Sequence, residues 1–446
     1  MAAARLHLDP DLDLDLDRTD ATDATDATGV RTTGSRPARP AALAAAAALV
    51  ATAASAALLL GPVPTATAAT ATAPATPLPA PRFLPEPPGT AYSLARGLSR
   101  DGAVVGEYYS DVSGQFTPRA VRWHPDHLGY TVLAPLTGDL SSRPAGLNGA
   151  GTVVGASYRT MSDNHPVRWA PDGTATALAL PAGVRGGSAA AVNDAGVVAG
   201  GSYDDTYRSK PLKWQADGTR VDLPLLPGDT AGSTAAVTNA GVVAGTSERS
   251  LGDGRSQETP VLWSPAGAVS ALPLPPGLDG ARVDGMTDDG VVLGHGRRTG
   301  GTEFDRVLVW TPGGAVRDAG YGRTRAVNSA GTVVGATFDA HRSAFAARWN
   351  PDGTQTLLGG PAGRQSEAMA VNGAGTAVGE AQGPDWNRTT ALLWRPDGTV
   401  VPLPPSPLSP YAQALFVNDA GVVAGNAVAL DAAGEPVAAH VIAWRS

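Results

Sequence analysis

The stretch Ser188-Ala-Ala-Ala-Val-Asn193-Asp-Ala-Gly196-Val-Val-Ala-Gly200 decides the fold of this chain. Small and β-branched residues flank a short polar segment that ends on glycine, which predicts two strands joined by a tight turn. The side-chain oxygen of Asn193 can accept a hydrogen bond from the backbone two residues on, and Gly196 suits a turn position with positive φ. The stretch therefore predicts a β-hairpin.

This hairpin is one copy of a unit that occurs eight times. Each copy is followed by a tryptophan, and these are Trp123, Trp169, Trp214, Trp263, Trp310, Trp349, Trp394 and Trp444. The glycines that match Gly200 are Gly106, Gly155, Gly200, Gly245, Gly294, Gly335, Gly379 and Gly425. The first turn position is held by Ser99, Asn148, Asn193, Thr238, Thr287, Asn328, Asn372 and Asn418. A period of about 45 residues in a strand-rich sequence is typical of a β-propeller, in which each repeat forms one blade.

Two more strands complete each unit. The third strand ends on the tryptophan, a turn of the form Pro-Asp-Gly-Thr follows, as in residues 350–354, and a short fourth strand comes next, as in residues 220–224. The last unit lacks this fourth strand, because only two residues follow Trp444. Residues 82–89, ahead of the first unit, resemble the fourth strand that begins at Leu272.

These observations predict an all-β fold. We predict an eight-bladed β-propeller of four-stranded blades over residues 82–446, with the last blade closed by the N-terminal strand at residues 82–89. Pairing that strand with the last unit would cover the sheet edges that an open array exposes. The tryptophans are predicted to pack between neighbouring blades. We expect a monomer.

The N-terminal part has a different composition. Residues 41–60 are apolar, three arginines precede them and Ala66-Thr67-Ala68 follows, so residues 30–68 are predicted to be a signal peptide that is cleaved near Ala68. Secretion to the extracellular space or the cell envelope follows, with a retained membrane anchor as the alternative. Residues 1–29 form an acidic leader that opposes such a signal, and translation from Met1 or from Val30 remains open. Residues 69–81 read as a linker rich in Pro, Ala and Thr.

Charge and cysteine content exclude several functions. The chain has a net charge of −8, and no stripe of Lys or Arg appears in it, so we expect no nucleic-acid partner and no membrane insertion after signal cleavage. The chain has no cysteine, which excludes disulfides and thiolate metal sites.

The pattern Ala-x-x-Asn-x-x-Gly-x-Val-Val-Gly, followed by a variable loop and a short strand that ends in Trp, resembles the HAF-repeat family of bacterial extracellular repeat proteins. The resemblance covers residues 91–446. Only His165 and His440 hold the histidine of the family's His-Ala-Phe run, so that histidine is not a shared catalytic group here. The resemblance implies secretion and a β-repeat fold, and it implies no defined activity.

No catalytic, phosphate-binding or dinucleotide-binding motif appears, and paired carboxylates do not stand out from the repeat. The pair His124-Pro-Asp-His127 is a weak metal candidate, because proline lies within it and no third ligand is near. We therefore assign no catalytic residue, cofactor or metal.

The variable connections after the second strands predict a binding face. Its candidate binding residues are Trp386, Asn387, Tyr109, Tyr158, Tyr203, Tyr207, Arg208, His341 and Arg342. We expect a secreted, non-enzymatic propeller that binds a carbohydrate or protein partner through this face. The alternative is an extracellular hydrolase or lyase that acts on a polysaccharide. An enzyme would place two or three carboxylates, or a histidine with an aspartate, from different blades around the axis.

Overall fold

The computed structural model describes residues 79–445 except 113–114, 161–162, 253–254, 302, 362–363, 383–388, 408–410 and 432–435. The predicted leader and signal peptide, and most of the linker, lie outside these residues. The described part is built from strands and turns and holds no helix that could span a membrane.

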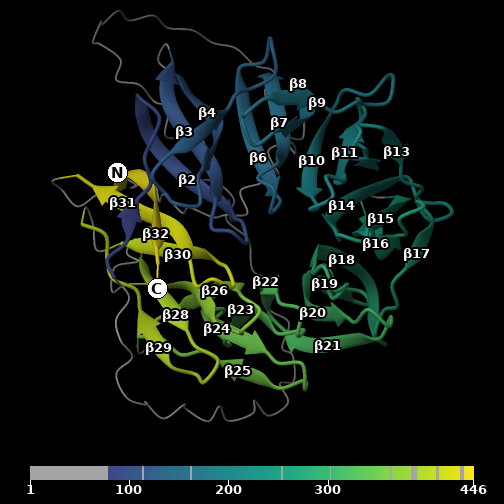
Figure 1. The fold of residues 1–446 in the computed structure, drawn as a ribbon. Helices are drawn as coiled ribbons and strands as arrows, with labels where there is room; N and C mark the ends of the chain where they lie inside the picture. Colours follow the sequence, from purple (N-terminus) through teal and green to yellow (C-terminus); the bar gives the residue numbers. More distant parts are fainter. Residues whose placement is uncertain are drawn as a thin grey trace, which may run out of the picture. The chain divides into compact units, whose positions relative to one another are not determined.

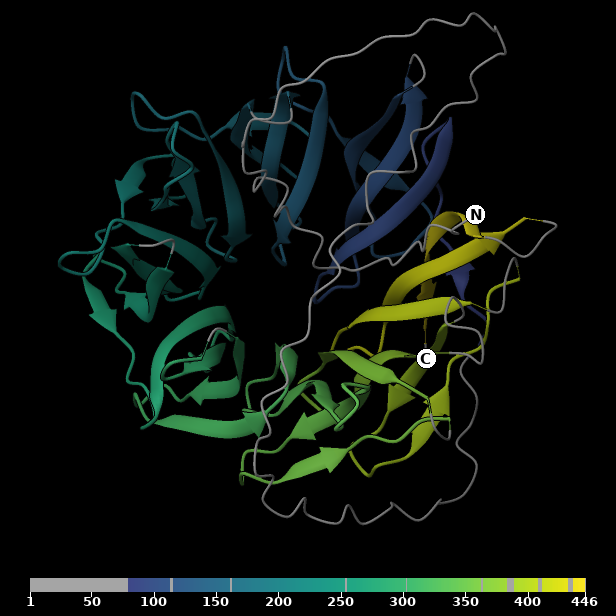
Figure 2. The same ribbon diagram turned by 180° about the vertical axis from the view of Figure 1, so that it is seen from behind.

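Eight four-stranded antiparallel sheets form a ring, which confirms the predicted eight-bladed β-propeller (Figures 1 and 2). Blades 1 to 4 consist of β2 (Thr90–Leu98), β3 (Val104–Val112), β4 (Gln115–Trp123) and β5 (Tyr130–Leu133); β6 (Ser141–Leu147), β7 (Val153–Thr160), β8 (Asp163–Trp169) and β9 (Ala175–Ala177); β10 (Gly186–Val192), β11 (Val198–Tyr203), β12 (Ser209–Trp214) and β13 (Arg220–Asp222); and β14 (Ala231–Val237), β15 (Val243–Gly252), β16 (Arg255–Trp263) and β17 (Val269–Ala271).

Blades 5 to 8 continue the ring in the same order. They consist of β18 (Leu278–Met286), β19 (Val292–Arg298), β20 (Phe304–Trp310) and β21 (Val316–Tyr321); β22 (Arg323–Val327), β23 (Val333–Phe338), β24 (Ala344–Trp349) and β25 (Gln355–Leu357); β26 (Ser366–Val371), β27 (Ala377–Gln382), β28 (Thr389–Trp394) and β29 (Val400–Pro402); and β30 (Ala412–Val417), β31 (Val423–Leu430) and β32 (Pro436–Trp444), with β1 (Arg82–Phe83).

The N-terminal strand closes the last blade, as predicted, but it is shorter than expected. β1 pairs with β32 through Arg82 opposite Ala443 and Phe83 opposite Ile442. The backbone N–H of Leu84 adds a hydrogen bond of 3.0 Å to the carbonyl oxygen of Val441. Residues far apart in the sequence therefore close the ring. Residues 84–89, which were also predicted as strand, do not form strand structure.

The tryptophans pack between blades, as predicted. All eight have 0% of their surface exposed. Trp263 of blade 4, for example, shares a core cluster with Ala199 and Leu223 of blade 3. Seven indole N–H groups donate to a carbonyl oxygen on the connection that enters the same blade, at 2.7–3.0 Å. Trp349 has no such partner, because β21 leads into β22 through Gly322 alone and leaves no connection to supply a carbonyl.

The turn after each innermost strand has a role that the sequence did not reveal. The glycines of these turns have positive φ, as predicted. All five asparagines at the first turn position also donate from Nδ2 to the carbonyl oxygen at the matching position of the next blade. One of these bonds, from Asn418 to Ser99 at 3.1 Å, joins the last blade to the first. The asparagines therefore link blades as well as shaping turns.

The repeat glycine faces a β-bulge in every blade. The innermost strand of each blade carries one extra residue opposite this glycine, and these bulge residues are Arg96, Ala145, Ala190, Ala235, Asp284, Arg325, Met369 and Leu415. A Cβ at Gly379 would overlap the carbonyl oxygen of Glu367, and each other repeat glycine meets the same obstacle. Only glycine lets the two strands approach at the bulge.

Candidate active site on the axial surface

One residue of each innermost strand faces the axis of the ring. We call these residues the axial row: Leu94, Arg143, Ser188, Ser233, Arg282, Arg323, Glu367 and Gln413. All except Gln413 are partly or fully exposed, whereas their strand neighbours are mostly buried between blades. This alternation indicates that the axial row meets solvent along the axis.

Each axial residue pairs with the residue that follows the repeat glycine. We call these partners the post-glycine row: Glu107, Ala156, Gly201, Thr246, His295, Ala336, Glu380 and Asn426. Blades 3 and 4 present only small side chains in the two rows and at the bulge. Blades 5 to 7 present nearly all charged or titratable ones. We call the two rows and the bulge residues together the axial surface. Its charged side chains are absent from blades 3 and 4 and frequent in blades 5 to 7.

Glu367 and Glu380 form a direct pair of carboxyl groups on neighbouring strands of blade 7. Directly opposed residues in antiparallel strands point to the same face, so the two carboxyl groups lie side by side on one face of the blade. Arginines of blade 6 bind Glu367: Arg323 Nη2 lies 2.6 Å from Oε2, and Arg325 Nε lies 2.8 Å from Oε1. Arg323 Nε also donates to Oε1 at 2.9 Å. Both oxygens of Glu367 are thus held by guanidinium groups.

Glu380 lies in a different environment. Burial raises its pKa to about 7, and the charge of Glu367 adds to the rise, while hydrogen bonds from Gln413 and Thr389 and the charge of Arg325 oppose it. Its Oε2 atom is buried without a hydrogen-bond partner. Two neighbouring carboxyl groups therefore differ in their surroundings, as in acid–base pairs of enzymes.

A histidine with an aspartate lies in blade 5, next to the first strand of blade 6. His295 Nδ1 is 2.6 Å from Asp284 Oδ2, and the Thr324 hydroxyl is 3.1 Å from both His295 Nε2 and Asp284 Oδ2. This resembles a hydroxyl–histidine–carboxylate triad, but the backbone N–H of Thr324 donates to Nε2 at 2.9 Å. That bond occupies the lone pair that a general base would need. The group is therefore a link between blades rather than a nucleophilic site.

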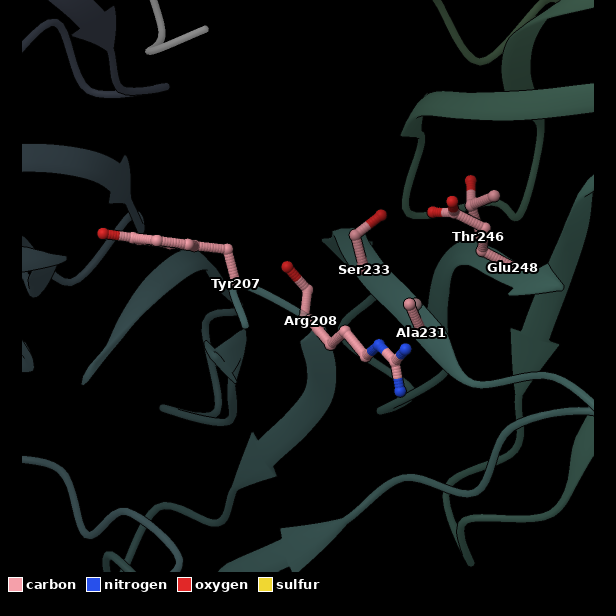
Figure 3. Close-up of a pocket in the computed structure, with 8 residues that line it drawn as sticks. Tyr207, Arg208, Ala231, Ser233, Thr246 and Glu248 are labelled. Carbon is pink, nitrogen blue, oxygen red and sulfur yellow. The ribbon is translucent and has the colours of Figure 1, made fainter. Parts of the chain in front are cut away.

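A pocket of about 210 Å³ lies between blades 3 and 4 (Figure 3). It is lined by Tyr207, Arg208, Ser209, Ala231, Gly232, Ser233, Thr246 and Glu248. Ser233 belongs to the axial row and Thr246 to the post-glycine row, so the pocket adjoins the axial surface. In a ring of eight, blades 3 and 4 lie across the axis from blades 7 and 8, which carry Glu380 and Gln413. The small side chains and the carboxyl pair thus lie on opposite sides of the axis.

Of the predicted binding residues, Tyr207 and Arg208 line this pocket, and Tyr203 stacks on Tyr207. Tyr203 and Tyr207 stack with centroids 5.9 Å apart, and the Arg185 guanidinium lies 5.1 Å from the Tyr207 centroid. Tyr207 has a positive φ of 57° and is 47% exposed, and Figure 3 shows its ring pointing away from Arg208.

The other predicted residues are separate from the pocket. Tyr109 stacks on Tyr92 at 4.3 Å and donates its hydroxyl to Glu107 at 2.7 Å, and Tyr158 lies under Arg143 at 5.9 Å. His341 and Arg342 are exposed on a turn of blade 6, where Arg342 contacts Glu303 at 3.4 Å. Trp386 and Asn387 lie outside the described residues. His127, half of the weak metal pair, is buried against the Gly102 carbonyl oxygen, and the described residues contain no cluster of three metal-ligating side chains.

The carboxyl pair was missed from the sequence. We expected no acidic residue to break the repeat, but Glu380 does, because it follows the repeat glycine at a position held by Ala, Gly, Thr, His or Asn in six other blades. Aligning the eight units on that glycine would have revealed it. Glu367 can be recognised as the partner of Glu380 only when the strand register is known, and the bulge shifts that register by one residue.

The fold is similar to that of several solved β-propellers. Puromycin hydrolase aligns with a TM-score of 0.48 and 15% identity over 80% of this chain and 62% of that one. Dipeptidyl peptidase 4 of Porphyromonas gingivalis aligns with a TM-score of 0.47 and 10% identity over 78% of this chain and 59% of that one. Virginiamycin B lyase of Staphylococcus aureus aligns with a TM-score of 0.38 and 13% identity, over 68% and 94%. No family model and no curated protein sequence matches.

The comparison corrects the expectation of a non-enzymatic binding protein, because these propellers belong to a hydrolase, a peptidase and a lyase. The chain spans about three fifths of the length of puromycin hydrolase. At these identities the likeness shows the fold alone, so an activity of this chain must rest on its own residues.

Proposed function

We propose that this protein is an extracellular enzyme that cleaves a uronate-containing polysaccharide by β-elimination on the axial surface, with Glu380 as the acid–base group. The observation that carries the proposal is the direct pairing of Glu380 with Glu367, a second carboxyl group that two arginines bind, and burial raises the pKa of Glu380 to about 7. A group with a pKa near neutral pH is well suited to both accept and return a proton.

The charge of the axial surface favours an anionic substrate. The axial row, the bulge positions and the post-glycine row contain five arginines and four carboxyl groups: Arg96, Arg143, Arg282, Arg323 and Arg325, with Glu107, Asp284, Glu367 and Glu380. The whole chain has an acidic excess of eight. Five arginines gathered on one surface of an acidic protein favour carboxylated ligands, because arginine binds a carboxylate with two hydrogen bonds.

The proposed step is redox-neutral. Glu380 removes the proton next to the uronate carboxylate, while an axial arginine stabilises the negative charge that develops on that carboxylate. The electron pair of the broken C–H bond forms a carbon–carbon double bond, and the glycosidic C–O bond breaks. The leaving oxygen takes a proton, which Glu380 can return. The products are one chain with a new end and one with an unsaturated sugar.

Hydrolysis through a pair of carboxylates is less compatible with this geometry. A retaining hydrolase needs a free carboxylate as nucleophile. Both oxygens of Glu367 accept hydrogen bonds from Arg323 or Arg325, so attack by Glu367 would break them. Elimination requires only that Glu367 and its arginines stay in place.

The pocket between blades 3 and 4 supplies a place for a neighbouring sugar. Its hydroxyl groups, on Ser209, Ser233 and Thr246, are the type of group that binds carbohydrate. Secretion, cleavage near Ala68 and membership of the HAF-repeat family are part of the same proposal, since an enzyme for polysaccharides has its substrate outside the cell.

The test is incubation of the purified protein with polygalacturonate, alginate and hyaluronate. We expect one of them to yield unsaturated products, seen by their ultraviolet absorbance, and Glu380→Gln to lower the rate at least about 100-fold, in the range that acid–base groups contribute. Glu303→Gln, at an exposed glutamate on a loop, is the matched control and should keep full activity. Reducing ends without ultraviolet absorbance would indicate a hydrolase instead, and equal rates for Glu380→Gln and the unmodified protein would exclude Glu380.

A further inference from the structure

Four polar side chains meet on the axis at the face that carries the tight turns. They are Arg100, Asp194, Asn239 and Asp288, each at the second position of its turn. Arg100 Nη2 lies 3.9 Å from Asp194 Oδ2 and 3.8 Å from Asp288 Oδ2. Asn239 Nδ2 donates to Asp194 at 3.0 Å and to Asp288 at 2.9 Å. Blades 1, 3, 4 and 5 therefore share one cluster.

Such a cluster must cross the axis. Blades 1 and 5 are diametrically opposed in a ring of eight, so an ion pair between Arg100 and Asp288 runs through the middle of the ring. Asn418 holds the backbone of Arg100 in place, because its Nδ2 donates to the Arg100 carbonyl oxygen at 3.2 Å. The ion pairs are exposed and contribute little stability. Their consequence is steric.

We infer that the axial surface is closed at the turn face, so that a polysaccharide enters and leaves only through the variable face and the protein acts on chain ends. This inference rests on the proposed function. A polysaccharide that passed through the ring would present its internal sugars to the site. A site that is closed at the turn face accepts only the end of a polysaccharide. The axial cluster of Arg100, Asp194, Asn239 and Asp288 is then a determinant of where along the polymer the cleavage falls.

Binding stoichiometry tests the inference without cleavage. The Glu380→Gln protein is titrated by calorimetry with short and long chains, of known chain number, of whichever of polygalacturonate, alginate and hyaluronate the unmodified protein cleaves. An end-binding protein should bind one protein per chain whatever the length. A number of bound proteins that grows with chain length would overturn the inference, and so would the absence of binding. Unsaturated products from the unmodified protein would still support the proposed function in either case.

Product length provides the second readout. We expect the unmodified protein to release short products beside nearly full-length polymer from the earliest times, and products of intermediate length at those times would contradict a closed site. The double variant with Arg100→Ala and Asp288→Ala opens the turn face and should give longer early products. Arg395→Ala is the matched control, since Arg395 lies on an exposed turn of the same face away from the axis, and it should leave the product lengths unchanged.

Discussion

At the residue scale, Glu380 stands where three other blades use an uncharged oxygen or nitrogen to connect to the next blade. In three blades the post-glycine side chain accepts a backbone N–H from the next innermost strand: Thr246 from Val283, His295 from Thr324, and Asn426 from Ala95. These hydrogen bonds satisfy buried backbone N–H groups without burying a charged side chain. A carboxyl group with one unpartnered oxygen is a poor substitute for them, which favours a functional reason for Glu380.

The first prediction concerns the stability cost of this group. The folded protein binds the Glu380 proton more tightly than the unfolded chain does. Protonation of Glu380 therefore stabilises the folded state fully below the unfolded pKa, near 4.5, and this stabilisation is lost as the pH rises through about 7. Glu380→Gln should therefore stabilise the protein at about pH 8, by roughly 1–3 kcal/mol, and much less at about pH 4.5. Urea unfolding at the two pH values measures this. A variant that loses stability equally at both would show that Glu380 is an ordinary packing residue.

The second prediction concerns the repeat glycine. Gly379→Ala would place a methyl group on the Glu367 carbonyl oxygen and within 2.9 Å of the Ala368 Cα. Because backbone must move on both strands, we expect a loss of several kcal/mol, as for other overpacked sites. Gly218→Ala, at a turn glycine with φ of 88° and no atom within 4 Å of a new Cβ, should cost only the smaller conformational strain. Thermal unfolding of both variants compares them, and equal losses would contradict the role of the bulge.

At the element scale, the turn asparagines act in two directions. Asn372 accepts a hydrogen bond from the Thr376 N–H at 2.9 Å within its own turn and donates to the Asn418 carbonyl oxygen at 3.1 Å in the next blade. Thr238, at the same position of blade 4, accepts the turn hydrogen bond through its hydroxyl. Its side chain is too short to reach the carbonyl oxygen of the next blade. The chain therefore contains both versions of the turn.

The third prediction uses this contrast. Asn372→Ala removes both bonds and should cost about 1–2 kcal/mol, whereas Asn372→Thr keeps the turn bond and should cost about half as much. Chemical denaturation of the two variants gives the comparison. If threonine and alanine were equally destabilising, the turn bond would contribute nothing and the link between blades would account for the whole effect.

The elements of the fold were predictable because every unit repeats the same local signals. A polar turn residue, a glycine with positive φ and a terminal tryptophan recur at fixed places, and each has a local physical reason. The bulge opposite Gly379 was not predictable, since it depends on two strands approaching closely. The same bulge sets which innermost residue faces the axis, so Glu367 and Arg325 were missed as site residues. Two of the predicted residues, Tyr207 and Arg208, line the same pocket because they lie on one variable connection, and their role in binding stays a prediction.

At the scale of the whole molecule, the closure of the ring depends on a few polar contacts as well as on β1. Glu86 lies 3.0 Å from His440 Nδ1 on β32 and accepts a hydrogen bond of 2.5 Å from the Ser93 hydroxyl on β2. The hydrogen bond with Glu86 raises the pKa of His440, against the opposing effect of burial. The N-terminal segment and the last strand, far apart in the sequence, thus meet at one carboxylate.

The fourth prediction follows from the sign of this shift. The raised pKa of His440 means that its contribution is complete below the unfolded pKa, near 6.5, and is lost as the pH rises through the higher folded value. The contact is partly exposed, so we expect His440→Gln to cost about 1 kcal/mol or less at about pH 6, and nothing at about pH 9. His341→Gln, at an exposed turn, serves as the control. A loss at about pH 9 as large as that at about pH 6 would contradict the ion pair.

A structure of the Glu380→Gln protein with an oligomer of the cleaved polysaccharide bound would show where the uronate lies relative to residue 380. We expect a uronate carboxylate within hydrogen-bond distance of an axial arginine, Arg282 or Arg323, with the sugar carbon next to that carboxylate facing residue 380. A sugar bound only on the outer strands, or an axial surface that stays empty at saturating ligand, would contradict this expectation.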